Sequence, residues 1–220
     1  MRSAAIDGLR VLRLPTVYPP ASDTDVLLGW LRDHGADGDV LELCAGTGVL
    51  ALVAVRTAAS VTAVDRCPWA AANIRLNAAL NAADLEVHRG DLFGAVAGRR
   101  FDTIVANPPY MPTPASGGGL RSRAWDSGWD GREVLDRLAA QAASHLRPGG
   151  VVLIVQSAFA DDRRTAALMA ASGLAVTTLD QRTQPLGPVS RARTGHLAAL
   201  GVLDPAAGVD ELVLLQGRQP

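Results

Sequence analysis

Short apolar runs rich in Val, Leu and Ala alternate along this chain with longer segments in which apolar residues recur at helical spacing. The short runs predict seven strands, at residues 40–44, 60–65, 85–89, 101–106, 151–156, 174–179 and 211–216. The longer segments predict helices at about 22–34, 49–58, 68–81, 131–145 and 161–172. We therefore expect an α/β fold, with a seven-stranded, mostly parallel, Rossmann-like sheet covered by helices on both faces.

Two stretches lie outside this alternation. Residues 1–20 are rich in proline and are expected to be irregular, and residues 111–128, rich in Pro, Gly and Ser, are expected to form a mobile loop. A length of 220 residues suits one well-packed domain. We expect a single domain over 1–220, with a lead-in and helix at 1–35 and a catalytic core at 36–220.

Composition narrows the function classes. The net charge is −1, which does not favour a nucleic-acid or membrane partner. All 21 basic residues are arginine, so sites that need a catalytic or phosphate-binding lysine are excluded. Cys44 and Cys67 have no nearby metal-ligand spacing, and we expect no metal. The sequence shows no signal-peptide core and no membrane-length apolar run, so a cytoplasmic enzyme is expected.

A glycine turn follows the first of the seven predicted strands. Gly46 and Gly48 stand at a strand-to-helix junction, where free backbone N–H groups and close backbone approach suit a ligand. The turn also fits the G-x-G-x-x-A dinucleotide pattern, so alone it is a weak signal. Three acidic residues make the signal of the glycine turn more specific. Glu42, before the turn, favours a cationic ligand. Asp65 can accept hydrogen bonds from ribose hydroxyls, and Asp91 can accept one from an adenine amine.

The tetrad Asn107-Pro108-Pro109-Tyr110 ends another predicted strand. Two prolines stiffen the loop and leave carbonyl acceptors free, and the Asn107 side chain adds an amide oxygen. Acceptors held in one plane suit a planar –NH2 group, and Tyr110 can cover its face. The tetrad therefore predicts transfer to an amide or amine nitrogen.

Taken in order, these motifs resemble those of class I S-adenosylmethionine-dependent methyltransferases. The lead-in 17–24, Ala124-Trp125 and the segment 131–137 resemble the short HemK-type branch, whose members methylate the glutamine of a Gly-Gly-Gln motif in translation termination factors. The resemblance covers roughly residues 17–180. It implies S-adenosylmethionine as cofactor, a termination factor as protein substrate, and in some members a small zinc-binding activator subunit.

The resemblance also implies site residues. The resemblance implies that the tetrad of Asn107, Pro108, Pro109 and Tyr110 is catalytic. It implies that the cofactor is bound by Thr24, Glu42, Gly46, Gly48, Asp65, Asp91, Leu92 and Asn107.

Two features depart from the family pattern. Cys44 replaces the usual first glycine of the turn, and the segment 181–210, which carries Arg182, Arg191, Arg193 and His196, is long. Its arginines form either a solvated surface or a binding patch.

Alternatives remain open from the residues. The same tetrad serves exocyclic base amines of RNA or DNA and small-molecule amines, although a neutral chain makes nucleic acid the less favoured acceptor. A nicotinamide oxidoreductase would leave Glu42, Asp91 and the tetrad without a task. An inactive binding module would not explain why the tetrad and the acids are intact.

Overall fold

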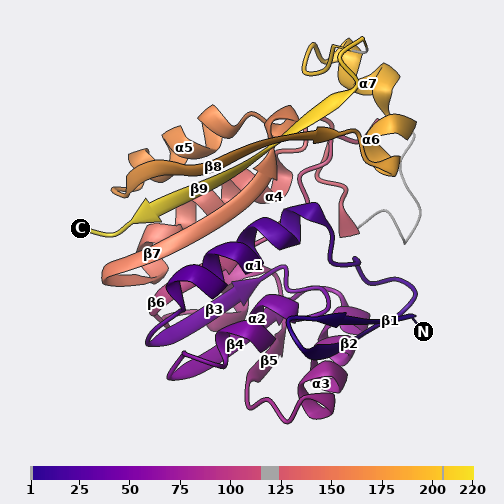
Figure 1. Cartoon of the computed structure of the whole chain (residues 1–220). Helices are drawn as coiled ribbons and strands as arrows, with labels where there is room; N and C mark the ends of the chain where they lie inside the picture. Colours follow the sequence, from indigo (N-terminus) through magenta and orange to yellow (C-terminus); the bar gives the residue numbers. More distant parts are fainter. Residues whose placement is uncertain (1, 115–123, 205) are drawn as a thin grey trace.

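A seven-stranded sheet forms the centre of the protein (Figure 1). This computed structural model describes residues 2–114, 124–204 and 206–220. The strands lie in the order β5-β4-β3-β6-β7-β9-β8. Their bounds are β3 Asp39–Leu43, β4 Ser60–Asp65, β5 Glu86–Arg89, β6 Phe101–Ala106, β7 Leu146–Ser157, β8 Ala175–Pro185 and β9 Val209–Arg218. Only β9 runs against its neighbours, so the expected mostly parallel sheet is confirmed.

Helices cover both faces of this sheet. The α-helices along the chain up to β8 are α1 Ser22–His34, α2 Val49–Ala54, α3 Pro68–Leu80, α4 Glu133–Gln141 and α5 Asp162–Ala171. Successive residues of each buried strand point to opposite faces. Val40 and Val105 pack with α1 and α2, whereas Leu41 and Ile104 pack with α4. This alternation explains why the central strands carry apolar residues on both faces.

The amino-terminal segment is not irregular, as its prolines had suggested. β1 Arg2–Ile6 and β2 Leu9–Arg13 form an antiparallel hairpin that lies against α3 (Figure 1). Three asparagines one helical turn apart, Asn73, Asn77 and Asn81, bind the backbone of β2. The prolines all lie beyond β2, in the connection to α1, so they do not interrupt the hairpin.

Several boundaries also differ from those expected. The second helix ends at Ala54 rather than near 58. β7 begins at Leu146 rather than at 151, so it includes the segment Pro148-Gly149-Gly150 that lay between the expected helix and the expected strand. β8 continues to Pro185, because it pairs with β9 along its whole length. The long connection before β9 carries two short helices, α6 Pro188–Ala192 and α7 Thr194–Ala199. The expected loop at 111–128 falls partly outside the described residues.

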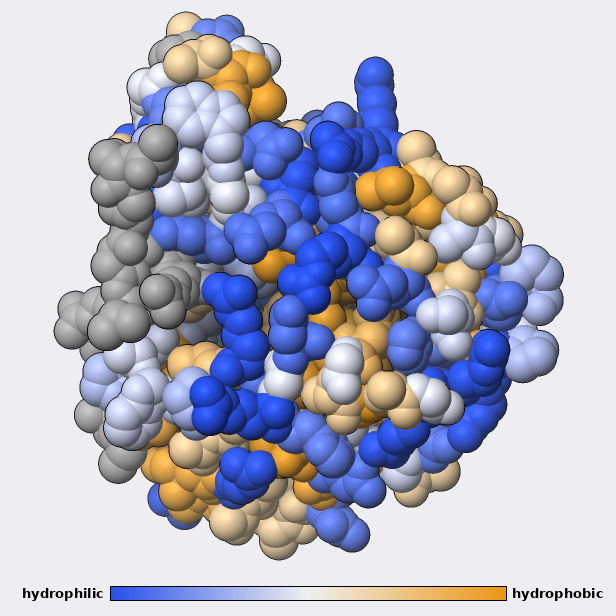
Figure 2. Space-filling view, turned by 180° about the vertical axis from the view of Figure 1, so that it is seen from behind, coloured by the Kyte–Doolittle hydropathy of each residue, from blue (hydrophilic) through white to orange (hydrophobic). Residues whose placement is uncertain are grey.

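The surface has no single apolar band on the face seen in Figure 2, which is largely hydrophilic with separate hydrophobic patches. Among the described residues, no helix combines the length and the hydropathy needed to cross a membrane.

We predict that Asn77→Ala destabilises the protein by about 1–3 kcal/mol, because buried backbone groups then lose their partners. Asn77 is fully buried, and its amide binds both backbone groups of Leu12 and the carbonyl of Thr47. Urea unfolding measures the change. Asn81→Ala is the control, because its contacts with Arg10 are exposed. Equal losses for the two variants would contradict this account.

Candidate functional site

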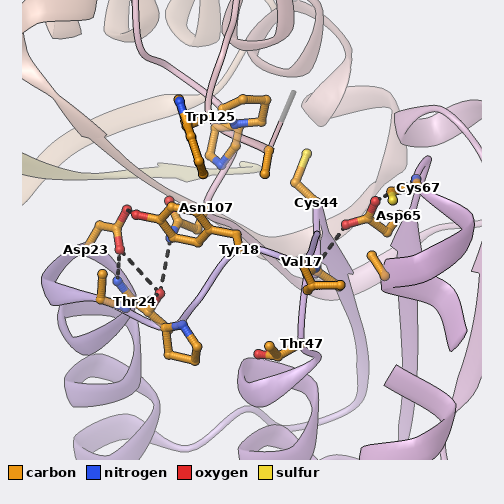
Figure 3. Close-up of a pocket in the computed structure, with 18 of the residues that line it drawn as sticks. Val17, Tyr18, Asp23, Thr24, Cys44, Thr47, Asp65, Cys67, Asn107 and Trp125 are labelled. Atoms are coloured by element: carbon orange, nitrogen blue, oxygen red, sulfur yellow. Dashed lines mark hydrogen bonds between the residues drawn. The ribbon is translucent and has the colours of Figure 1, made fainter. Parts of the chain in front are cut away.

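One large cavity of about 1000 Å³ opens where β3, β4 and β6 end (Figure 3). Parallel strands bring their carboxyl ends to one edge, and β3 lies between β4 and β6. The order of the strands reverses at this point, which is where open α/β sheets bind ligands. The cavity is lined by the glycine turn, the tetrad, the start of α1 and residues near α6.

The tetrad forms one end of the cavity. All four of its residues line the wall, and Asn107 Nδ2 lies 3.2 Å from Thr24 Oγ1 (Figure 3). The Tyr110 carbonyl packs so closely on Gly131 that any Cβ there would collide with it. Gly131 has a φ of +78°, so glycine is the residue that both this backbone and this contact require.

Behind the tetrad lies a buried carboxylate. Asp23, only 3% exposed, accepts the Tyr18 and Tyr110 hydroxyls at 2.9 and 3.0 Å. It also accepts the Thr24 backbone N–H at 2.7 Å. Burial, and then the charge of Asp23, raises the pKa of both tyrosines well above its ordinary value. Both hydroxyls therefore keep their protons at neutral pH.

The acid before the glycine turn is buried beneath it. Glu42 is 2% exposed and accepts the Ala51 backbone N–H at 2.8 Å, so it caps α2 as well as lining the cavity. Burial raises the pKa of Glu42 to about 8, and the nearby Asp65 charge contributes.

Three residues of the turn itself have left-handed backbone conformations. Cys44, Gly46 and Gly48 have φ values of +57°, +54° and +76°. Cys44 and Gly46 line the cavity, but Gly48 is not among the lining residues. A Cβ on Gly48 would lie 2.8 Å from Ile74 Cγ2, so this glycine lets α3 pack closely.

The opposite end of the cavity holds the other expected acids (Figure 3). Asp65 accepts the N–H groups of Gly46 and Cys67 at 2.9 and 2.8 Å, and a carboxylate retains further lone pairs for a ligand. Burial raises the pKa of Asp65. Asp91 is more exposed and pairs with Arg137 at 2.6 Å, and Leu92 follows it in the wall.

The cavity thus gathers the expected site residues apart from Gly48. Glu133, at the start of α4, is exposed and lies outside the lining. Sequence reasoning missed several lining residues: Tyr18, Asp23, Trp69, Gln184, Ser190 and Asp210. Asp23 stands directly before Thr24 in the lead-in motif, a signal that could have identified it. Gln184, Ser190 and Asp210 come from the distant carboxyl-terminal segment and carry no local signal.

The charge of the lining is acidic. Five carboxyl groups line the cavity, from Asp23, Glu42, Asp65, Asp91 and Asp210, together with two guanidinium groups, from Arg66 and Arg89. Glu42, with its pKa raised to about 8, is mostly protonated at neutral pH, so the other four supply the negative charge. Most of these acids are buried. Such a wall attracts a cationic ligand and repels phosphate.

The arginines of the segment 181–210 differ from one another. Arg182 is exposed and pairs with Asp180, as a solvated surface residue does. Arg193 is mostly buried and donates to the Pro112 carbonyl, Thr113 and Asp126, so it joins α7 to the chain after the tetrad. His196 binds the Trp129 carbonyl at 3.0 Å. Arg193 and His196 are therefore structural contacts, neither solvated surface nor an open binding patch.

We predict that Cys44→Gly is more stable than Cys44→Ala by about 0.5–1 kcal/mol. Left-handed backbone costs about 1–2 kcal/mol with a Cβ, and the entropy of glycine offsets part of that gain. Urea unfolding compares the two variants. Ala45→Gly should show the ordinary destabilisation, because Ala45 is not left-handed. If the alanine variant at 44 is the more stable, the backbone there is not strained.

A second prediction concerns pH. Folding raises the pKa of Glu42 to about 8 from an ordinary value near 4.5, so the folded state binds the proton more tightly. Its contribution to stability is therefore present below about pH 4.5 and is lost as the pH rises towards 8. Glu42→Gln should reduce the fall in unfolding free energy between pH 6 and 8.5. Urea unfolding at both pH values tests this, and equal falls in both proteins would overturn it.

Comparison with known proteins agrees with this geometry. The model of the methyltransferase small domain matches residues 9–123. A protein from Methanocaldococcus jannaschii named as a putative protein N5-glutamine methyltransferase is 37% identical over 163 residues, covering 73% of this chain and 82% of its own. A release factor glutamine methyltransferase from Geobacter sulfurreducens is 31% identical over 157 residues, covering 67% of this chain and 55% of its own.

Solved structures share the fold. That of the E. cuniculi Mtq2-Trm112 complex, described as responsible for methylation of the eRF1 termination factor, has a TM-score of 0.64 at 21% identity, with 93% of this chain and 99% of that one covered. The chain spans 82% of the M. jannaschii relative but about half of the release factor enzymes. It therefore belongs to the methyltransferase small domain family, in its HemK-type protein N5-glutamine methyltransferase branch.

Proposed function

We propose that this enzyme uses S-adenosylmethionine to methylate the side-chain amide of a glutamine in the Gly-Gly-Gln motif of a translation termination factor. The observation that carries the proposal is the placement of Asn107–Tyr110 in the wall of the same acidic cavity as the glycine turn. One end of that cavity suits a planar nitrogen, and the rest suits a cationic nucleoside.

The lining fits the proposed cofactor. Its sulfonium and ammonium groups are positive, and five carboxyl groups, four of them besides the protonated Glu42, line the cavity with two arginines. In this proposal Asp65 accepts from the ribose hydroxyls, and Asp91 and Leu92 border the adenine. Glu42, Gly46 and Thr24 would hold the methionine end. When bound, this cofactor supplies an electrophilic methyl group.

The residues of the tetrad then have to position the acceptor. An amide nitrogen is a poor nucleophile because its lone pair is delocalised. Oxygen acceptors from the Asn107 side chain and the Pro108 carbonyl would orient its –NH2 group and stabilise the positive charge that develops on nitrogen. These bonds strengthen as the charge grows, which favours the transition state over the ground state.

Tyr110 does not act as a base in this scheme. Its hydroxyl donates to Asp23, and burial raises its pKa well above the ordinary value. Glu133 is exposed and lies outside the cavity. We propose that the proton leaves to water after methyl transfer.

A protein acceptor is favoured over a nucleic acid. Phosphate binding needs basic side chains, whereas this cavity is acidic and the net charge is −1. The relatives from M. jannaschii and G. sulfurreducens are both named for glutamine methylation. Glycines beside the glutamine would let its backbone approach a narrow mouth. A termination factor places the proposed reaction in the cytoplasm.

An activator subunit belongs to the proposal. The Mtq2 neighbour was solved as a complex with Trm112, and that structure shares the whole fold. We propose that a small zinc-binding protein of this kind supports the present enzyme.

The test is mass spectrometry of a folded termination factor incubated with enzyme and S-adenosylmethionine, with and without a candidate activator. We expect a mass gain of one methyl group on the Gly-Gly-Gln glutamine, and none when that glutamine is replaced by alanine. Asn107→Ala should lower kcat by about 100-fold, because it removes a positioned acceptor. Its affinity for the cofactor, measured by calorimetry, should change much less.

Parallel reactions with radiolabelled cofactor and a cell lysate, separated into protein, RNA and small molecules, identify a different acceptor. An unmodified factor under all conditions, together with label in RNA or a small molecule, would overturn the glutamine assignment. Near-normal turnover by Asn107→Ala would overturn the planar-nitrogen mechanism.

A further inference from the structure

One buried carboxylate is joined to both ends of the tetrad. Asp23 Oδ2 accepts the Tyr110 hydroxyl at 3.0 Å. Asp23 Oδ1 accepts the Thr24 hydroxyl at 3.3 Å, and Thr24 Oγ1 in turn lies 3.2 Å from Asn107 Nδ2. The first and last residues of the tetrad thus depend on one side chain that lies 84 or more positions away in the sequence.

The Thr24 hydroxyl determines which way the Asn107 amide faces. A hydroxyl has one proton, and Thr24 gives it to Asp23, which as a carboxylate can only accept. Towards Asn107, Thr24 Oγ1 can therefore only accept, so the NH2 group of Asn107 must face it. The amide oxygen of Asn107 is then directed away from Thr24. No hydrogen bond from the described part of the chain reaches that oxygen.

We propose that Asp23 is a positioning residue for methyl transfer. Through Thr24 it presents the Asn107 oxygen, rather than its NH2 group, to the acceptor nitrogen, and it holds the Tyr110 ring directly. This proposal rests on the proposed function for its kinetic consequence, but not for the orientation of Asn107, which can be measured in the protein alone.

Neutralising Asp23 removes the constraint. In Asp23→Asn the new amide can donate as well as accept, so Thr24 can point its proton at Asn107 and allow the amide to turn over. An NH2 group would then face the acceptor NH2 group, with two donors opposed. The shape and burial of the side chain are almost unchanged, so the effect isolates hydrogen-bond direction.

The first measurement follows the Asn107 side-chain amide by NMR on full-length, ¹⁵N-labelled protein, assigned by its absence in Asn107→Ala. We expect Asp23→Asn to shift this signal and to speed its hydrogen exchange. Asp25→Asn is the matched control, because Asp25 is an exposed carboxylate on the same helix. If the Asn107 signal is the same in wild type and Asp23→Asn, the proposal is wrong, whatever the acceptor is.

The second measurement is kinetic and uses the methyl acceptor found for the wild-type enzyme. Asp23→Asn should lower kcat by about 10–100-fold, as expected for loss of orientation, while KM and cofactor affinity change by less than about threefold. In an Asn107→Ala background the same substitution should cost little more, because the two act as one unit. A merely structural role predicts instead parallel losses in kcat, cofactor affinity and thermal stability, and additive effects in the double variant.

Discussion

The site depends on the pairing of β3 with two neighbours in matched register. Leu43 pairs with Val64 on one side and with Ala106 on the other. The residues that follow these three, at 44, 65 and 107, therefore lie at the same level at the carboxyl edge of the sheet. A one-residue slip of β6 would turn the Asn107 side chain towards the opposite face. The apolar side chains of the central strands pack against helices on both faces and hold this register, so the core of the sheet also sets the geometry of the cavity.

This dependence explains which parts of the site could be read from the sequence. Glu42, Asp65 and Asn107 belong to strand ends that the apolar pattern marks clearly, and the structure brings them to one cavity. Asp23 was missed although it stands next to Thr24 in the lead-in, because the local pattern does not show that this helix N-terminus meets a strand 80 residues later. Asp210 and Ser190 were missed for a similar reason, since their position depends on the path of the chain after β8.

The fold was readable to a similar extent. The seven-stranded, mostly parallel sheet and the helices on both of its faces follow from the alternation of short apolar runs with helical segments. The β1–β2 hairpin was not, because its strands are short and its hydrogen-bonding partners are asparagines on α3. These asparagines take the place of a neighbouring strand beside β2, and no hydrophobic pattern in the sequence marks a strand that is bound in this way. The role of Arg193 was equally hidden, because a guanidinium that binds backbone carbonyls looks, in the sequence, like any surface arginine.

The insertion of β9 between β7 and β8 has a consequence for protein synthesis. β8 is made before β9, yet its neighbour in the sheet is β9 alone. While the chain grows, β8 therefore has no place to dock, and β7 presents an open edge until residues 209–218 have been translated. A ribosome that pauses in the α6–α7 connection would hold a nascent chain in which the apolar strand β7 has one open edge, a known hazard for association between chains. The antiparallel strand thus closes a sheet that the earlier strands cannot complete by themselves.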